Sequence, residues 1–396
     1  MIGPRAVVCL GLTQLVNWGV TFYLIGAFGP AMTADLGWDA TLIYGGLSAA
    51  IVTMALVSPL AGSAVDRWGG HVVMPVGAVV AAGGCVLLAA AHTVVWYYLA
   101  WLLLGIGMRL SLYDAAFAAL ARAGGPTARR AMSQITLFGG LSSTAMWPAG
   151  HALAAWLGWR GAVLVYAALA LATLPLYLAL PRQRYAAPAT AADSNTPGLT
   201  RSLAERRLAG TLYAVIAMVT NFLAAGTAAH LIALLTGVGL ASAAAAGVAA
   251  LWGIGQFAAR MADVAVGARL HPLTLNWAVT ALMPFCFVLG WFSNGNLYAT
   301  AAYAFFYGAC NGLLTITRGT LPLALFDFRS YGKLVGALLV PSFLLTAAAP
   351  VAYAFVIQTQ GARAAMAMSV VLAAAIASAA WVLRRRFIGR VTAMAA

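Results

Sequence analysis

Long apolar runs alternate with short polar breaks from one end of the chain to the other. The apolar runs are about 20 residues long, which is enough for an α-helix to cross a hydrocarbon core of about 30 Å. The polar breaks between them hold most of the charged residues. The pattern predicts twelve spans, at residues 7–33, 40–62, 72–91, 94–120, 130–155, 160–180, 208–236, 241–266, 272–292, 297–319, 333–357 and 363–383.

One long polar stretch divides these spans into six and six. It covers residues 181–207 and is rich in arginine, with Asp193, Ser194, Asn195 and Pro197 at its centre. We therefore predict an N-terminal six-helix bundle at 1–180, a cytoplasmic linker at 181–207 and a C-terminal six-helix bundle at 208–396. The expected fold class is an all-α polytopic membrane protein with two pseudo-symmetric halves.

Composition supports a membrane protein. Hydrophobic residues make up 63% of the chain and charged residues 8%, whereas a soluble domain carries about 25% charged residues. The first apolar run is too long for the core of a signal peptide, so we take it as the first span. The four cysteines lie in apolar runs without metal-ligand or redox spacing, and we expect small buried residues rather than disulfides; they are Cys9, Cys85, Cys286 and Cys310.

The net charge of +14 reflects the sidedness of the membrane. Nucleic-acid binding would need basic residues on one soluble face, but here they lie in the gaps between apolar runs. If the N-terminus is inside, the outer loops hold only Arg160 and Arg363 as basic residues. Basic residues remain on the cytoplasmic side. Both termini are therefore predicted to be cytoplasmic, with membrane lipid and not nucleic acid as a partner.

A recognisable motif follows the second predicted span. Residues 62–71 read GSAVDRWGGH and resemble the G-x-x-x-D-R-x-G-R-K signature between helices 2 and 3 of the major facilitator superfamily. Gly62, Asp66, Arg67 and Gly69 match, while the closing basic pair is replaced. The resemblance implies two six-helix halves that move a substrate by alternating access. It also implies close helix packing at Gly62, a contact from Asp66 to a neighbouring helix end or arginine, and an inner-surface role for Arg67. The alternative is a simple charged turn.

Shorter pieces suggest a branch of that superfamily. The second half holds a degraded copy of the motif at residues 260–269, RMADVAVGAR. ADLGW at 34–38 and AAR at 258–260 resemble the monocarboxylate and oxalate/formate transporters. In that branch a helix-8 arginine binds the substrate carboxylate, and Arg260 matches its position. The sequence NWG at 17–19 departs from the relatives, so the identity of the substrate does not carry over.

Two ionisable residues lie within the fourth predicted span. A charge at the centre of a span costs about 2.5 to 3.5 kcal/mol, so it usually faces a cavity or a partner. Arg109 and Asp114 would point about 140° apart on a continuous helix, which disfavours a local pair. Arg109, with Arg260, offers planar donor forks suited to carboxylate or phosphate. Alternatively, Arg109 neutralises Asp114 through a water, and the cavity takes a neutral or lipophilic compound.

Asp114 has two further predicted roles. Helices 4 and 10 face each other in the superfamily, and aligning the halves places Asp114 next to Arg318, so the two could form an inner gate. Alternatively, Arg318 only extends to the interface. Asp114 is also the leading proton carrier, because burial and a nearby arginine shift its pKa in opposite directions. His230 and His151 are weaker candidates, because a histidine in an apolar helix is more often a packing residue.

Polar residues in the spans supply further substrate contacts. Helices 1, 4, 7 and 10 usually line the cavity in this superfamily. The resemblance therefore implies substrate contacts from Asn17, Tyr23, Asn221 and Asn311. Alternatively, some of them form helix–helix hydrogen bonds worth about 0.6 kcal/mol each.

These observations favour transport over catalysis. The eight acidic residues are scattered, no metal or nucleophile constellation is evident and there is no phosphate-binding loop, so we expect no enzyme activity, cofactor or metal. We predict a secondary transporter of a small organic anion, a carboxylate, coupled to protons by symport or antiport. The alternatives are an exporter of lipophilic drugs or metabolites and, less favoured, a transport-dead sensor. Short loops and an alanine-rich chain suggest a bacterial inner membrane, and we expect a monomer.

Overall fold

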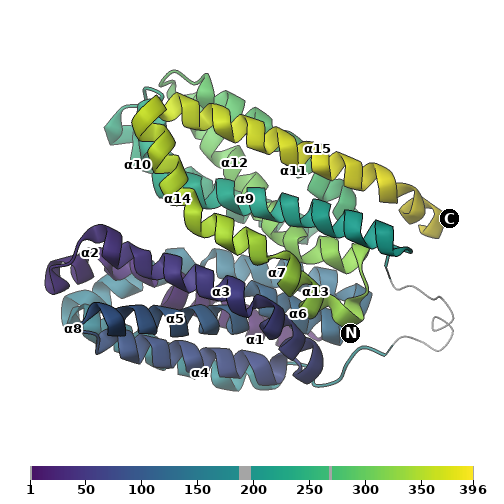
Figure 1. Cartoon of the computed structure of the whole chain (residues 1–396), viewed down its shortest axis with the longest axis horizontal. Coiled ribbons are helices and arrows are strands. Elements are labelled where there is room, and N and C mark those ends of the chain that lie inside the picture. The colour runs from purple at the N-terminus through teal and green to yellow at the C-terminus, as the bar shows by residue number, and fades with distance from the viewer. Residues whose placement is uncertain (1, 187–197, 267–269, 396) are drawn as a thin grey trace. The chain divides into compact units, whose positions relative to one another are not determined.

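All regular structure in the described residues is helical. The structure is a computed structural model, and it describes residues 2–186, 198–266 and 270–395. Within these ranges there is no strand. The helices fall into two compact units, one of residues 1–188 and 328–340 and the other of 189–327 and 341–396. Each unit is described by itself below, and Figure 1 labels its helices.

The described residues of the first unit form nine α-helices and several short helical turns. α1 is followed by a π-helical segment, Trp18–Phe22, and α6 by the 3-10 turn Gly125–Ala128. A further 3-10 segment, Leu174–Ala179, ends the run of helices in residues 1–188. The α-helices are α1 (Pro4–Asn17), α2 (Leu24–Leu36), α3 (Ala40–Trp68), α4 (Gly70–Ala89), α5 (Val94–Ser111), α6 (Tyr113–Gly124), α7 (Arg129–Gly140), α8 (Ser142–Ala172) and α13 (Tyr331–Leu338).

Six helices of 20 residues or more make up the described part of the second unit. α15 packs against both α9 and α11, and α12 packs against α10 and α11. Figure 1 shows α9, α11 and α15 running along one another. The six are α9 (Leu203–Gly237), α10 (Ser242–Val266), α11 (Pro272–Trp291), α12 (Leu297–Leu325), α14 (Val340–Gln360) and α15 (Ala362–Ala395).

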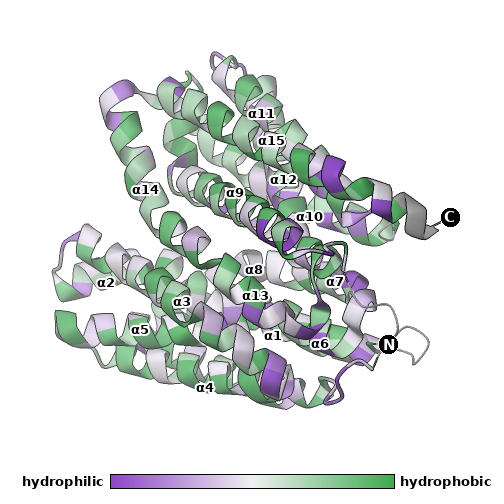
Figure 2. Cartoon of the chain, turned by 45° about the vertical axis from the view of Figure 1, so that its right-hand side comes forward, coloured by the Kyte–Doolittle hydropathy of each residue, from purple (hydrophilic) through white to green (hydrophobic). Residues whose placement is uncertain are grey.

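Nine helical segments in the described part of the chain are long and apolar enough to cross a membrane. Figure 2 shows hydrophobic residues along them. One segment, Val94–Ala179, has 86 residues, about 130 Å of helix, so it must cross more than once. α12 has 29 residues but is not among the nine, because polar residues such as Asn311 and Arg318 lower its hydropathy. Three crossings within the long segment, together with α12, would make the twelve predicted spans, and the count stays a prediction.

The fourth predicted span is two helices rather than one. α5 ends at Ser111 and α6 begins at Tyr113, because Leu112 is extended, with φ −82° and ψ −169°. Gln14 of α1 donates a hydrogen bond from Nε2 to the Ser111 carbonyl oxygen at 2.9 Å, which satisfies a backbone group that the break leaves free. The 140° angle between Arg109 and Asp114 assumed a continuous helix and does not apply.

The GSAVDRWGGH motif begins inside a helix instead of after one. α3 continues through the motif to Trp68, and the chain turns only at Gly69, whose φ is +85°. Val65, in the middle of the motif, is fully buried, so the extra turns contribute to the core. At the other end of α3, Asp39 Oδ1 accepts a hydrogen bond from Thr41 N at 2.7 Å. Hydrogen bonds from the Thr41 side chain and backbone lower the pKa of the Asp39 carboxyl below its ordinary value.

The two ends of the linker belong to different units. At its start, Tyr185 N donates to the Arg122 carbonyl oxygen at 2.9 Å. At its end, Leu199 N donates to the carbonyl oxygen of Ala324 at 3.2 Å. Residues 203–207, predicted as linker, instead form the first turn of α9, because Ser202 caps the helix by accepting from Glu205 N at 3.2 Å. The centre of the linker, residues 187–197, lies outside the described residues, as does the 267–269 end of the degraded motif copy.

Phe328–Val340 groups with the first unit although it follows the second half's helices in the sequence. Backbone contacts explain the grouping. Ser58 Oγ of α3 donates to the Gly336 carbonyl oxygen of α13 at 2.7 Å. A Cβ at Gly62 would collide with the Gly332 carbonyl oxygen, so the two helices touch backbone to backbone. The predicted C-terminal bundle 208–396 therefore contains a segment that packs elsewhere.

The two arginines predicted in the outer loops, Arg160 and Arg363, both connect ends of helices. Arg160 donates from Nη1 to the carbonyl oxygens of Ala89 and Ala91, at 2.6 and 2.9 Å, where α4 ends. It also pairs with Asp35 at 3.2 Å. Arg363 donates from Nη2 to Asn294 Oδ1 at 2.7 Å. Both positive charges thus have structural partners. These partners give a reason for two arginines to lie in predicted outer loops, where basic residues are rare.

Candidate functional site

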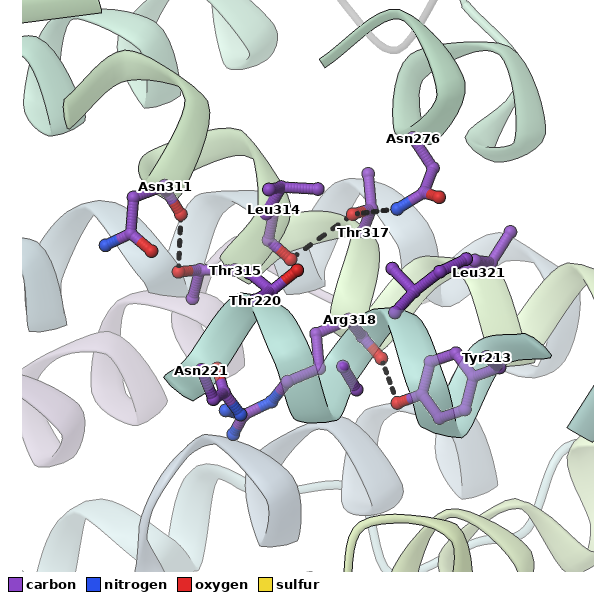
Figure 3. A pocket seen from close by; sticks show the side chains of 12 residues that line it. Tyr213, Thr220, Asn221, Asn276, Asn311, Leu314, Thr315, Thr317, Arg318 and Leu321 are labelled. Atoms are coloured by element: carbon purple, nitrogen blue, oxygen red, sulfur yellow. Dashed lines mark hydrogen bonds between the residues drawn. The ribbon is translucent and has the colours of Figure 1, made fainter. Parts of the chain in front are cut away.

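A polar pocket lies within the second unit, between α9, α11 and α12 (Figure 3). Its volume is about 350 Å³, including the part that is open to solvent. Most of its lining side chains are amides, hydroxyls or aliphatic groups. The lining residues are Tyr213, Ile216, Ala217, Thr220, Asn221, Asn276, Asn311, Leu314, Thr315, Thr317, Arg318 and Leu321.

α12 supplies half of the lining through one helical face. Asn311, Thr315 and Arg318 are spaced four and three residues apart, so they lie on the same side of the helix. Thr315 Oγ1 donates to the Asn311 carbonyl oxygen at 2.9 Å. Tyr213 of α9 donates from its hydroxyl to the Arg318 carbonyl oxygen at 2.9 Å, which fixes the backbone at the arginine. In Figure 3 the Arg318 side chain extends toward Asn221.

Asn276 Oδ1 and Thr220 Oγ1 are buried atoms of the lining that have no hydrogen-bond partner within the described residues. Asn276 donates from Nδ2 to Thr317 Oγ1 at 3.0 Å, but its Oδ1 is unpartnered. Thr220 Oγ1 is also unpartnered. Buried polar groups are almost always hydrogen-bonded, so a ligand or water is expected to complete these contacts.

The charge of the pocket is one-sided. Arg318 is the charged side chain among its twelve described lining residues, and none of the twelve is acidic. A concave site with charge of one sign and low-dielectric walls concentrates the opposite charge. The lining therefore favours an anion or a polar neutral group over a cation.

Arg260 lies directly behind the lining of the pocket. It is 5% exposed, and its Nη2 donates to Gln256 Oε1 at 3.2 Å and to Thr315 Oγ1 at 3.4 Å. Thr315 is itself a lining residue. Arg260, the predicted carboxylate-binding residue, is therefore separated from the pocket by the side chain of Thr315. Its hydrogen bonds connect α10 to α12.

Arg109 is buried in the first unit against α3. It is 2% exposed, and its Nε donates to Ser58 Oγ at 2.9 Å. Ser58 in turn donates to Gly336 of α13, so Arg109 supports the contact between α3 and α13. Asp114, 7% exposed, lies in the first turn of α6. Arg318 belongs to the second unit, so the predicted Asp114–Arg318 gate stays a prediction.

Of the contacts predicted from helix 1, Asn17 lies in the interior of the first unit and Tyr23 is half-buried. Asn17 is fully buried and donates from Nδ2 to the Tyr177 hydroxyl at 2.8 Å. Tyr23 ends the π-helical segment, and its carbonyl oxygen accepts from Trp147 Nε1 at 3.2 Å. By contrast, Asn221 and Asn311 of the second unit line the pocket. Asn221 donates from Nδ2 to Ser342 Oγ at 2.8 Å.

The two candidate histidines differ in burial. His230 lies at a kink of α9, with φ −121° and ψ 15°, and its Nε2 is 2.8 Å from the Pro350 carbonyl oxygen of α14. His151 is exposed.

The motif residues form a tight junction with α13. Asp66 accepts hydrogen bonds from the backbone N–H groups of Gly332 and Lys333, at 2.9 and 2.8 Å. These groups lie in the first turn of α13, where a carboxylate also stabilises the helix dipole. Arg67 lies over the ring of its neighbour Trp68, 5.4 Å from the centroid, and Gly69 allows the turn into α4.

Sequence reasoning missed several lining residues. Thr315 shares the helical face of the predicted residues Asn311 and Arg318, and this spacing was a usable signal. Thr220, Asn276 and Tyr213 come from α9 and α11, and only packing brings them to the pocket. No cluster of His, Cys, Asp or Glu that could hold a metal occurs in residues 2–186, 198–266 and 270–395.

Comparison with known proteins places the fold. The sequence profile of the Major Facilitator Superfamily matches residues 10–263. The human organic anion transporter MFSD10 (TETRAN) superposes with a TM-score of 0.71 and 16% identity, over 96% of this chain and 100% of that one. The proton:xylose symporter XylE gives a TM-score of 0.73 and 13% identity, over 95% and 94%.

The E. coli fucose:proton symporter FucP gives a TM-score of 0.70 and 14% identity, over 96% of this chain and 98% of that one. A search of curated proteins finds no match. The structural likenesses show the fold, and the profile covers well over half of the sequence. This polytopic, all-helical chain therefore belongs to the Major Facilitator Superfamily and is a membrane transporter rather than an enzyme.

Proposed function

We propose that the protein is a secondary transporter of a small organic anion, a carboxylate, and that the pocket of the second unit binds it. The observation that carries the proposal is Arg318 in a polar lining that contains no acidic residue among its described members. Guanidinium groups bind carboxylates through two parallel hydrogen bonds.

The other lining groups refine the substrate class. Thr220 Oγ1 can donate a hydrogen bond to a carboxylate, whereas the unpartnered Asn276 Oδ1 can only accept one. A carboxylate that also bears a hydroxyl group would use both atoms together with Arg318. We therefore favour hydroxycarboxylates over plain fatty acids.

We base the proposed transport mode, alternating access with proton coupling, on the family. Alternating access moves two halves of such a transporter around one substrate site. Asp114 and His230 are our candidates for proton coupling, and Asp114 with Arg318 for the inner gate. MFSD10 is described as an organic anion transporter, and XylE and FucP as proton symporters. We further propose that the protein acts as a monomer in a bacterial inner membrane.

Ligand binding to the detergent-purified protein tests the substrate class. Thermal unfolding would be followed with hydroxycarboxylates, plain carboxylates, phosphorylated metabolites, neutral sugars and lipophilic cations. We expect hydroxycarboxylates to raise the unfolding temperature most, Arg318→Gln to abolish the shift, and the exposed Arg206→Gln to retain it. A shift caused only by lipophilic compounds and indifferent to Arg318→Gln would replace the proposal with a drug or metabolite exporter.

Reconstituted vesicles test the proton coupling. A vesicle with an imposed pH gradient should accumulate the stabilising anion, and collapse of the gradient with a protonophore should stop accumulation. Asp114→Asn should remove the dependence on the gradient but leave counterflow exchange of the anion. If both Asp114→Asn and His230→Gln accumulate the anion as the wild type does, neither residue carries the proton.

A further inference from the structure

The C-terminal part of α15 presents two arginines, each stacked on a tryptophan. The Arg384 guanidinium lies 4.7 Å from the ring centroid of Trp277 in α11, and that of Arg385 lies 4.6 Å from the centroid of Trp381, one turn earlier in α15. We infer that this Arg384–Arg385 pair is a binding site for the phosphate group of an anionic phospholipid. The inference is independent of the transported substrate.

The stacking leaves the donors of both arginines available. A guanidinium packed face-on against a ring is held by its plane, whereas its five N–H groups point outward from the edge. The Nε of Arg384 is buried and has no hydrogen-bond partner among the described residues. Because that atom is enclosed by the protein, a phosphate would bind the Nη donors at the outer edges of the two guanidinium groups.

Among the described ion pairs, the carboxylate beside this end of α15 is that of Glu205, and it is paired with other arginines. Arg390 binds both oxygens of Glu205, at 2.8 and 2.6 Å, and Arg386 lies 3.7 Å from the same group. Within the described residues neither Arg384 nor Arg385 forms an ion pair with a carboxylate. The pair therefore keeps its positive charge for an external anion.

The surface around the pair is one that lipid would cover. Val371, Trp381 and Val382 on α15 are 68%, 44% and 40% exposed, and such exposed apolar side chains on a membrane helix face acyl chains. Arg385 follows Val371 by about 21 Å of helix, which places its charge near the headgroup layer. Tryptophan is enriched at that depth. Figure 2 shows hydrophilic residues interrupting α15 toward the C-terminus.

Phospholipid fits this site better than a soluble anion. A phospholipid brings its phosphate to the arginines and its acyl chains to the exposed apolar residues in one molecule. Basic clusters between helices at the inner surface bind anionic headgroups, and sidedness predicts that this end of the helix is cytoplasmic. Free phosphate would use only the arginines.

Binding of phosphatidylglycerol to the purified full chain tests the inference. Native mass spectrometry would titrate the protein with phosphatidylglycerol and with phosphatidylcholine, and thermal unfolding would be followed with each lipid and with inorganic phosphate. We expect a shift for phosphatidylglycerol that saturates at low stoichiometry and exceeds those for phosphatidylcholine and phosphate. The Kd should rise about fivefold for each arginine replaced.

Double variants distinguish a specific lipid-binding site from nonspecific electrostatic attraction between the protein and anionic lipid. Arg384→Gln/Arg385→Gln should lose most of the binding, whereas Arg206→Gln/Arg207→Gln, which removes the same charge from α9, should bind as the wild type does. Equal losses in both doubles, or an equal shift with phosphate alone, would overturn the inference. Arg384→Lys/Arg385→Lys retains the charge and removes the planar fork, so it should bind more weakly than the wild type even if the glutamine double does not fold.

Discussion

At the residue scale, single atoms decide how closely the helices of the first unit approach. Gly62 and Gly332 touch through their backbones, and a Cβ on either would meet the carbonyl oxygen of the other. Asp66 then binds the two N–H groups that begin α13. The glycines allow α3 and α13 to approach closely, and the Asp66 carboxylate then holds the start of α13 in place.

Replacing Gly62 with alanine should destabilise the protein by about 1 to 3 kcal/mol, because backbone atoms cannot move aside as a side chain can. Gly83→Ala is the matched control, since a Cβ at Gly83 meets nothing within 4 Å. The control should be neutral or stabilising by about 0.5 to 1 kcal/mol, because alanine favours the helix. Thermal unfolding in one detergent compares them, and equal losses would contradict the proposed contact.

Replacing Asp66 with asparagine should loosen the start of α13. The amide retains the shape, but only its oxygen can accept, so one of the two backbone N–H groups loses its acceptor and the other loses a charged one. Amide hydrogen exchange at Gly332 and Lys333 should become roughly tenfold faster. Asp35→Asn, at the Arg160 pair, is the control and should leave exchange at α13 unchanged. Unaltered protection at Lys333 in the Asp66 variant would show that the carboxylate does not hold this helix.

At the scale of elements, the breaks in helices are as informative as the helices. α5 and α6 are separated at Leu112, and α1 passes into a π-helical segment at Trp18. Non-helical backbone at membrane depth persists only where the protein satisfies its polar groups. Gln14 does so by donating to Ser111. This break cannot be read from hydropathy, because residues 94–120 are apolar on both sides of it.

Replacing Gln14 with methionine, which has a similar volume, should cost about 1 to 3 kcal/mol, because the Ser111 carbonyl oxygen then loses its buried donor. Leu12→Met on the same helix is the control, since Leu12 is 38% exposed and should tolerate the change. The unfolding temperatures of the two variants make the comparison. A Gln14 variant as stable as the control would mean that another group satisfies the break.

At the scale of the whole molecule, the distribution of charge sets the orientation in the membrane. Sidedness predicts that Ser202, before α9, is cytoplasmic and that Asn294, between α11 and α12, is external. Arg160 and Arg363, the basic residues predicted outside, both have partners at helix ends. The orientation itself stays a prediction.

Cysteine labelling in intact cells tests this orientation. Asn294→Cys should react with a membrane-impermeant maleimide, whereas Ser202→Cys should react only after the membrane is permeabilised. Three of the four native cysteines are buried and Cys9 is half-buried, so the background from the parent protein should be low. The reverse pattern of labelling would invert the predicted topology.

The sequence by itself determined the class of protein. Apolar runs long enough to span a bilayer can be recognised without the tertiary structure, because the surface of each run must be covered by lipid or by another helix. The motif around Asp66 carried the family, which the profile match confirms. Asn221, Asn311 and Arg318 were named among the functional residues, although Arg318 was assigned to a gate.

Only the tertiary structure decided which polar residues share a pocket. Arg109, Arg260 and Asn17 looked equally functional in the sequence, yet each is buried against other helices. Thr220 and Asn276 were ordinary polar residues of their spans and line the pocket with Arg318. Hydropathy records only that a polar side chain lies within a span, whereas helix rotation and packing decide whether it meets a neighbour or a cavity. That rotation is set by contacts between residues far apart in the sequence, such as Asn276 with Thr317.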